Sequence, residues 1–227
     1  MLNLIKEIKQ PILLTGATGF LGSNLLHFFV KNNVQIHIII REQSNLWRIK
    51  NIINKTHKHI VDLEDFNKIK RVIKKIKPKT IFHLATYGAY PNQNNFEKIK
   101  KINFDALINL IKECSKYDFN IFINTGSSSE YGTKNKKMSE NDIVEPDNYY
   151  AIFKSATTLY CETIAKKDKL PIITVRPFHV YGPYEEKTRL IPTIIKYLQK
   201  NQSPPLVSPN ITRDMIYIED VINFYIL

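Results

Sequence analysis

The sequence contains very little cysteine. Its 227 residues include only Cys114 and Cys161, and each lies in a stretch with a helix-like pattern. Two isolated cysteines exclude the dense disulfide framework of small secreted domains, and no Cys/His spacing fits a metal site. We therefore expect two reduced thiols in a cytoplasmic protein, and no bound metal.

Long apolar runs are also missing. The first ten residues carry Lys6, Glu7 and Lys9 and include no cleavage site of small residues. This stretch is not typical of a signal peptide. No other run approaches the roughly 20 apolar residues that a membrane-spanning helix needs. The sequence therefore predicts no membrane partner.

Arginine is scarce although the chain is basic. The net charge is +12, yet only six of the 33 basic residues are arginines, and the lysines accompany many Asn and Ile residues. This pattern is typical of an AT-rich coding sequence whose lysines spread over solvated surfaces. A nucleic-acid interface would instead gather Arg, Lys and aromatic residues. We predict no nucleic-acid partner, while the positive field favours an anionic nucleotide substrate.

Glycine is sparse too, but three of the seven glycines stand together in Gly16-Ala17-Thr18-Gly19-Phe20-Leu21-Gly22. An apolar run precedes them and a helical pattern follows, which indicates a strand, a tight turn and a helix. Gly16 can take the turn's backbone angles, Gly19 leaves room for a pyrophosphate, and Gly22 lets the helix pack closely on the strand. No Gly-Lys-Ser/Thr follows, so a nucleotide triphosphatase is not expected. The pattern favours a dinucleotide site over an ordinary turn between a strand and a helix.

Apolar runs alternate with amphipathic stretches along most of the chain. The runs predict strands over residues 12–14, 34–40, 60–61, 80–84, 119–124 and 172–175. The amphipathic stretches predict helices over residues 23–31, 66–76, 96–117 and 149–166. This alternation predicts an α/β fold of Rossmann type, a doubly wound parallel sheet with helices on both faces.

The composition changes after Arg176. Six prolines interrupt the pattern between residues 177 and 209, and the predicted elements become short. We predict a dinucleotide-binding Rossmann domain over residues 1–176 and part of a smaller substrate-binding lobe over residues 177–227. Residues 220–227 form an apolar helix start without a polar finish, which predicts that the complete protein continues past Leu227.

Tyr150 and Lys154 are the first candidate catalytic pair. They lie four residues apart in a predicted helix and therefore share one face, whereas Tyr149 has no lysine at this spacing. A phenol is a poor base at neutral pH because its ordinary pKa is about 10. A nearby ammonium lowers that pKa, so the pair could move a proton to or from a sugar hydroxyl. The alternative is an amphipathic helix with a solvated lysine.

A hydroxyl cluster, Ser127-Ser128-Ser129, follows the strand predicted over residues 119–124. In parallel α/β sheets, ligands bind at the carboxyl ends of the strands. A serine there can hydrogen-bond a substrate oxygen and hold it against Tyr150. Taken alone, the cluster would be interpreted as a serine-rich turn.

Together these motifs resemble the extended short-chain dehydrogenases/reductases, and more narrowly their nucleotide-sugar epimerase/dehydratase branch. The glycine turn, Ser127 and the Tyr150/Lys154 pair carry the resemblance, which extends over residues 10–227. Further matching segments follow in the expected order, namely His83-Leu84-Ala85, Asn103, Asn109-Leu110, Arg176-Pro177-Phe178-His179-Val180-Tyr181-Gly182-Pro183 and Arg213-Asp214-Met215-Ile216-Tyr217-Ile218-Glu219-Asp220-Val221.

The resemblance implies a role for each motif. Tyr150 would be the acid/base, Ser127 its partner, and Lys154 would also hold the nicotinamide ribose. The residues implied to bind NAD or NADP are Gly16, Gly19, Phe20, Leu21, Gly22, Arg41, Asp62, Leu63, Leu84, Ala85, Thr86, Tyr150, Lys154 and Pro177. The residues implied to bind a nucleotide-diphosphate sugar are Ser128, His179, Arg189 and Arg213, although Arg189 could equally be a surface arginine. A homodimer and a place in polysaccharide biosynthesis are implied as well.

Three features depart from the family pattern. Arg41 stands where an acidic residue would accept the adenosine ribose hydroxyls, and an arginine there can contact a 2′-phosphate, so NADP is slightly favoured. Ser128 and Ser129 replace the Asp-Glu pair usual in the sugar dehydratases, and Glu130 lies one place further on. His179 replaces a common asparagine, and both ligand binding and simple packing remain open for it.

The predicted function is a nucleotide-sugar epimerase or 4-ketoreductase. By the resemblance, hydride passes between sugar C4 and the nicotinamide while Tyr150 handles the hydroxyl proton. A 4,6-dehydratase is the disfavoured alternative, because elimination of water needs an acid/base pair. A non-catalytic dinucleotide-binding regulator would typically lack Tyr150 or Lys154. A nucleic-acid binder would need a basic stripe on the folded surface.

Overall fold

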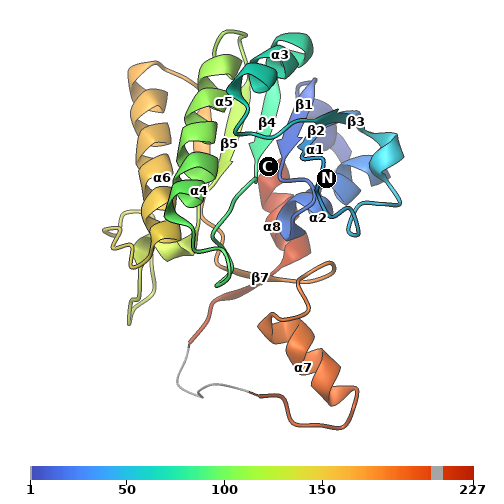
Figure 1. The fold of residues 1–227 in the computed structure, drawn as a ribbon, viewed down its shortest axis with the longest axis vertical. Coiled ribbons are helices and arrows are strands. Elements are labelled where there is room, and N and C mark those ends of the chain that lie inside the picture. The colour runs from blue at the N-terminus through green and yellow to red at the C-terminus, as the bar shows by residue number, and fades with distance from the viewer. Residues whose placement is uncertain (1, 206–211) are drawn as a thin grey trace.

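The computed structural model describes residues 2–205 and 212–227, and a parallel sheet lies at its centre (Figure 1). The sheet order is β3-β2-β1-β4-β5-β6, and every neighbouring pair is parallel. Its strands are β1 (Ile12–Thr15), β2 (Ile36–Ile40), β3 (His57–Ile60), β4 (Thr80–His83), β5 (Ile121–Thr125) and β6 (Ile172–Val175). The order reverses between β1 and β4, which opens a crevice at the carboxyl ends of these strands. The predicted Rossmann-type fold is confirmed.

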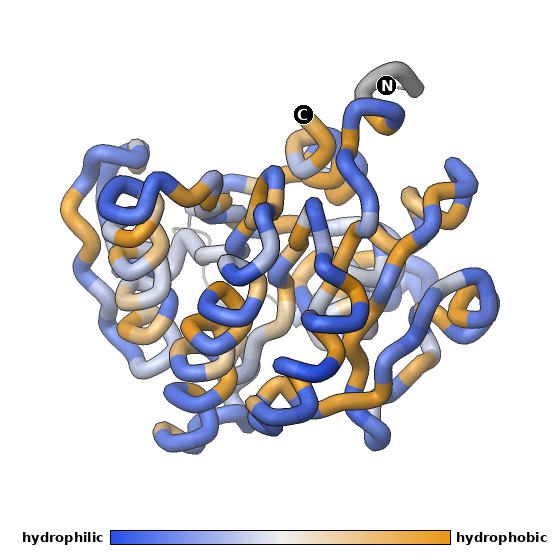
Figure 2. Tube along the Cα trace, turned by 90° about the horizontal axis from the view of Figure 1, so that it is seen from above, coloured by the Kyte–Doolittle hydropathy of each residue, from blue (hydrophilic) through white to orange (hydrophobic). Residues whose placement is uncertain are grey.

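Helices bury both faces of the sheet. On one face, α2 (Phe20–Lys31) and α8 (Ile218–Ile226) pack on Ile12 and Leu14 of β1. On the other face, α3 (Phe66–Ile76), α5 (Ala106–Cys114) and α6 (Tyr149–Lys167) pack on Leu13. Neighbouring β1 residues thus face opposite cores, as a two-residue side-chain period requires. Figure 2 shows the apolar stretches running through the centre, with hydrophilic residues on the outer helices.

Several element boundaries differ from the prediction. The edge strand β3 lies at His57–Ile60 rather than 60–61, because its mostly exposed, polar residues form no apolar run. The helix predicted over 96–117 consists of α4 (Phe96–Lys100), a π-helical stretch Lys101–Asp105, and α5, which ends at Cys114. The π-helical stretch places Asn103 inside the protein, where its side-chain oxygen accepts hydrogen bonds from Thr86 Oγ1 and the Tyr87 N–H. Such π-helical bulges are frequent at functional sites.

The segments after residue 176 pack in two different parts of the protein. Strands β7 (His179–Tyr181) and β8 (Met215–Tyr217) form a separate parallel pair, and α7 (Leu190–Leu198) lies away from the central sheet (Figure 1). Helix α8, in contrast, packs into the same core as α2. The domain division at 176/177 stays a prediction, and α8 shows that a segment beyond this point contributes to the core beside the sheet.

The remaining short elements are α1 (Leu2–Glu7), η1 (Ile53–Lys55) and η3 (Ser128–Tyr131). Among residues 2–205 and 212–227, no helix has both the length and the apolar character needed to cross a membrane.

Close backbone packing shapes the glycine turn between β1 and α2. Gly16 has a φ of +74°, and a Cβ there would lie 2.5 Å from the Ala85 nitrogen. A Cβ on Gly22 would lie 2.2 Å from the Gly16 carbonyl oxygen, whereas one on Gly19 would lie 3.3 Å from it. Gly22 therefore sets how closely α2 approaches the turn, while Gly19 faces more open space.

We expect Gly22→Ala to destabilise the protein, because its methyl group must displace the Gly16 carbonyl. Overpacking of this kind costs about 1–3 kcal/mol, and urea unfolding followed by circular dichroism measures it. Gly19→Ala is the matched control and should change the unfolding free energy by about 0.5 kcal/mol or less. Equal stabilities of the two variants would contradict this account of the turn.

Candidate active site

A cavity of about 970 Å³ opens at the carboxyl ends of the strands, and its wall contains every residue that the sequence assigned to a site. The lining includes Gly16, Gly19, Phe20, Leu21, Gly22, Arg41, Asp62, Leu63, Leu84, Ala85, Thr86, Ser127, Ser128, Tyr150, Lys154, Pro177, His179, Arg189 and Arg213. The fold thus brings together residues that are separated by up to 197 positions in the chain, from Gly16 to Arg213. Their individual roles stay predictions, because a shared cavity does not assign them.

One end of the cavity has the form of a dinucleotide cradle. Backbone atoms leave no room for a Cβ on Gly16 or Gly22, which keeps the turn tight, and α2 begins directly after Gly19, its N-cap residue. A helix N-terminus presents unpaired N–H groups and a positive dipole end to phosphate. Arg41 lies exposed at the rim after β2. These residues fit a dinucleotide cofactor.

Tyr150 lies in the first turn of α6, where the Asn148 side chain accepts a hydrogen bond from the Ala151 N–H and starts the helix. The side chains of Ser127 and Thr86 lie near its phenol, and hydrogen bonding to either of them lowers its pKa. Three segments, after β4, after β5 and in α6, therefore meet at this hydroxyl. Burial raises the pKa of Tyr150, although both hydrogen bonds act in the opposite direction.

The Lys154 ammonium contacts a backbone carbonyl and lies over the Tyr150 ring. Its Nζ donates a hydrogen bond of 2.7 Å to the Thr125 carbonyl and lies 5.8 Å from the centre of the Tyr150 ring. The side chain is buried, and this burial lowers the pKa of Lys154 to about 8. We expected the pKa of Tyr150 to lie below its ordinary value, but it is raised, because desolvation of the phenol outweighs the groups that lower it, Ser127, Thr86 and Arg189. The phenol is therefore protonated at neutral pH.

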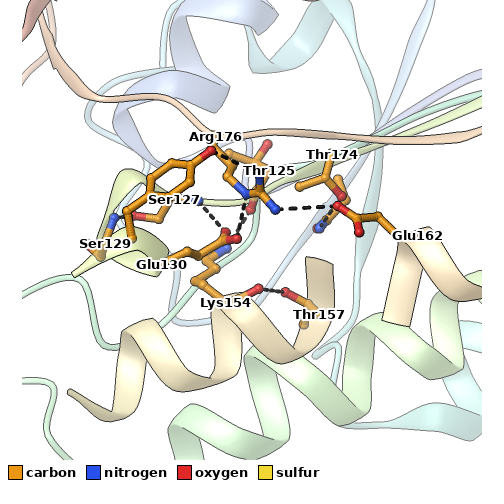
Figure 3. Close-up of polar contacts among 11 residues, drawn as sticks. Thr125, Ser127, Ser129, Glu130, Lys154, Thr157, Glu162, Thr174 and Arg176 are labelled. Carbon is orange, nitrogen blue, oxygen red and sulfur yellow. Dashed lines mark hydrogen bonds and ion pairs between the residues drawn. The ribbon is translucent and has the colours of Figure 1, made fainter. Parts of the chain in front are cut away.

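Ser127 follows β5 and begins the short helix η3. Its hydroxyl oxygen accepts a hydrogen bond from the Ser129 N–H at 3.1 Å, and its own N–H donates to Glu130 Oε1 at 2.8 Å. Glu130 is fully buried and also pairs with Arg176 Nε at 2.7 Å (Figure 3). Glu130 therefore points into the protein and is absent from the cavity wall.

Glu130 and Arg176 are structurally important residues to which the sequence interpretation assigned no role. A signal was present in the spacing Ser127-x-x-Glu130, which is that of a helix capping box. In such a box, the acid turns back to the N–H of the capping serine. Nothing in the sequence pairs Glu130 with Arg176, because the two lie 46 residues apart.

The opposite end of the cavity carries the predicted substrate-binding residues. Arg213 donates a hydrogen bond of 2.7 Å to His179 Nε2. Burial and the neighbouring Arg213 lower the pKa of His179, so its imidazole is neutral and accepts this bond. Arg189 precedes α7, donates to the Ala89 carbonyl at 3.2 Å and lies 4.7 Å from the Tyr90 ring centre. These contacts leave guanidinium groups of two arginines at the cavity wall.

Two further buried groups support the site from below. His83 bonds through Nδ1 to Thr15 Oγ1 at 2.9 Å, and burial lowers its pKa to about 3, so it is neutral. The Tyr225 hydroxyl bonds to Thr125 Oγ1 at 2.8 Å, which links α8 to the end of β5. The sequence contains no signal for this second contact. Within the described ranges, no group of His, Cys, Asp or Glu side chains could hold a metal ion.

Known proteins resemble this chain over almost its whole length. It is 25% identical to the dTDP-D-glucose 4,6-dehydratase of Dictyostelium discoideum, and the match covers 95% of this chain but 54% of that protein. It is 28% identical to the uncharacterized UDP-glucose epimerase YtcB of Bacillus subtilis (strain 168), over 94% of this chain and 70% of YtcB. The chain thus spans only part of each relative.

Solved structures share the fold. The UDP-glucose 4-epimerase of Thermotoga maritima with UDP-glucose is 23% identical, with a TM-score of 0.84 over 93% of this chain and 71% of that one. The UDP-glucuronic acid 4-epimerase of Bacillus cereus, solved with UDP-glucuronic acid and NAD, is 24% identical, with a TM-score of 0.79 over 95% and 71%.

The family comparison agrees with the geometry of the cradle and of the hydroxyl network around Tyr150. The model of the NAD dependent epimerase/dehydratase family matches residues 12–227. Because this match includes all six strands of the sheet and all of the candidate site, the chain belongs to the NAD dependent epimerase/dehydratase family.

Proposed function

We propose that the protein is a nucleotide-sugar epimerase or 4-ketoreductase that uses NAD(P) and acts at sugar C4. The observation that carries this proposal is the hydroxyl network of Tyr150, Ser127 and Thr86 beside the dinucleotide cradle. The names of the relatives support nucleotide-sugar chemistry in general, since they include both an epimerase and a dehydratase. The presence of both Tyr150 and Lys154 in the cavity wall speaks against a non-catalytic regulator.

In this proposal, the chain's own residues handle the proton. A bound nicotinamide would exchange a hydride with sugar C4. Tyr150, beside Ser127 and Thr86, would give its proton to the C4 oxygen during reduction, and in the oxidation direction its phenolate would take the proton of the C4 hydroxyl. Lys154 places a positive charge beneath the tyrosine ring, which stabilises the phenolate that forms when the proton leaves. Arg189 and Arg213 would bind the diphosphate, since a guanidinium fork matches phosphate geometry.

The arrangement after Ser127 supports C4 chemistry over 4,6-dehydration. Dehydration needs one group to take the C5 proton and another to protonate the leaving C6 hydroxyl, and Ser128 and Ser129 do neither well near neutral pH. Glu130 is tied to the Ser127 N–H and to Arg176 below the wall. Among the described residues, the carboxylates in the wall are Asp62, after β3, and Glu185, before α7. Neither occupies a place beside Ser127 in the chain.

The cofactor preference, the assembly and the location are finer parts of the proposal. Arg41 supports NADP over NAD because it is exposed and lines the cavity, and an arginine after this strand can contact a 2′-phosphate. The nucleotide sugar as substrate, a homodimer and a cytoplasmic location belong to the proposal as well.

The products formed from a panel of nucleotide sugars test the function. We expect a C4 epimer without added cofactor, or NADPH-dependent reduction of a 4-keto sugar, detected by chromatography and mass spectrometry. No 4-keto-6-deoxy sugar should form from a nucleotide hexose, because the wall offers no acid/base pair beside Ser127. Detection of that product would restore the dehydratase.

Tyr150→Phe should lower turnover by about 10²–10⁴-fold, the usual contribution of a positioned acid/base. Cofactor binding should change little, because the phenol proton is used only in the chemical step. Initial rates and fluorescence titration with NADPH measure the two quantities. Tyr160→Phe, in the same helix but outside the cavity wall, is the matched control and should retain full activity. Near-normal turnover of Tyr150→Phe would show that another group is the base.

Arg41→Asp should reverse the cofactor preference. A charge-assisted hydrogen bond contributes about 1.5–3 kcal/mol, so the Kd for NADP should rise by about 10- to 100-fold while the Kd for NAD stays similar or falls. Isothermal titration measures both constants. Arg71→Asp, on the exposed face of α3, controls for the change in net charge. Tighter NAD binding by the unchanged protein, or no effect of Arg41→Asp, would rule out the role of Arg41.

A further inference from the structure

Glu130 is a fully buried acid whose two oxygens have different partners. Oε1 accepts the Ser127 N–H at 2.8 Å, and Oε2 accepts the Arg176 Nε–H at 2.7 Å (Figure 3). The space around this carboxylate is closely filled, since a Cβ on Gly126 would lie 2.5 Å from Oε1. The carboxylate therefore has little freedom to move away from Ser127.

Arg176 is itself held from several sides. Its Nη1 donates to the Tyr131 hydroxyl at 3.0 Å. Its Nη2 donates to Glu162 Oε1 at 3.5 Å (Figure 3). Its side chain is 14% exposed, whereas that of Glu130 is not exposed at all. Removing one partner of such a buried pair leaves an uncompensated charge. The pair thus joins η3, the end of β6 and α6 directly behind the cavity wall.

The consequence concerns the orientation of the Ser127 hydroxyl. The backbone of Ser127 is fixed by Glu130, and its Oγ accepts the Ser129 N–H at 3.1 Å. With Oγ already accepting this bond, its position opposite the Tyr150 phenol depends on the backbone of residues 127–129. That backbone depends on the carboxylate of Glu130.

We propose that Glu130, anchored by Arg176, is a positioning residue that holds Ser127 in hydrogen-bond contact with Tyr150. This inference rests on the function proposed above. Glu130 takes no part in proton transfer with the substrate, since it lies behind the wall. It acts through Ser127 alone.

The charge of Glu130 and its geometry affect Tyr150 in opposite ways. Its negative charge raises the pKa of Tyr150, whereas the hydrogen bond from Ser127, which Glu130 positions, lowers it. The other groups around the phenol are Thr86 and Arg189, which lower its pKa, and Lys154 beneath the ring. Glu130 also raises the pKa of Lys154. A substitution that changes only the charge of Glu130 and one that changes only its position should therefore shift the pKa of Tyr150 in opposite directions.

Two variants make this separation. Glu130→Asp keeps the charge but withdraws the carboxylate from Ser127, so the pKa of Tyr150 should rise and kcat should fall by about 10- to 100-fold. Glu130→Gln removes the charge and retains an oxygen for the Ser127 N–H, so the pKa of Tyr150 should fall. NMR of [13Cζ]-tyrosine-labelled protein measures this pKa, with the Tyr150 signal identified by its absence from Tyr150→Phe. KM and cofactor Kd should stay within about twofold in both variants.

Glu162→Gln is the matched control, because Glu162 is the half-exposed outer partner of Arg176. It should leave kcat and the Tyr150 titration unchanged. A double-mutant cycle then tests the route: Glu130→Asp should add no further loss of kcat to Ser127→Ala. If a Glu130 variant fails to fold, Arg176→Lys keeps the positive charge, loses the guanidinium contact to Tyr131, and should raise the Tyr150 pKa.

Unchanged titration of Tyr150 in Glu130→Asp, or additive losses in the cycle, would overturn the positioning role. These outcomes are distinct from failure of the proposed function. A wild-type protein that converts no nucleotide sugar would contradict the function, while the titration of Tyr150 would still report whether Glu130 positions Ser127.

Discussion

The burial of both faces of the parallel sheet is the constraint on which the rest of the structure depends. Leu13 faces one core and Ile12 and Leu14 face the other, so helices must cover the sheet on both sides. Parallel strands joined by such helices all end at the same edge. Residues that follow the strands, from Gly16 after β1 to Pro177 after β6, therefore gather at that edge and line one cavity.

Burial beneath the carboxyl edge of the sheet sets the pKa values of the ionisable groups in the site. Desolvation lowers the pKa of Lys154 and of His83, and it raises the pKa of Tyr150. Each group is thus pushed toward its neutral form, as burial of ionisable groups requires. His83 remains neutral against Thr15, while Lys154 obtains a carbonyl partner in Thr125.

The direction in which the Glu130 carboxylate points decides what it can do in this fold. A carboxylate that reached the cavity beside Ser127 could take part in elimination chemistry. Here the carboxylate is directed inward, where Arg176 offsets its charge and the Ser127 N–H occupies its second oxygen. The wall beside Ser127 is left with the hydroxyls of Ser128 and Ser129, which suit hydrogen bonding to a sugar and do not suit acid/base elimination.

The alternation of strands and helices, the glycine turn and the Tyr150/Lys154 spacing could all be predicted from the sequence, because they are local patterns within one or two turns of chain. It placed β3 too late and read residues 96–117 as one regular helix, since an exposed edge strand and a π-helical stretch leave no clear hydrophobic period. Three features required the folded structure: Arg176 neutralises Glu130, Tyr225 of α8 contacts the end of β5, and burial raises the Tyr150 pKa. These features depend on which residues, distant in the sequence, are buried next to one another. That arrangement is fixed only when the helices pack on both faces of the sheet.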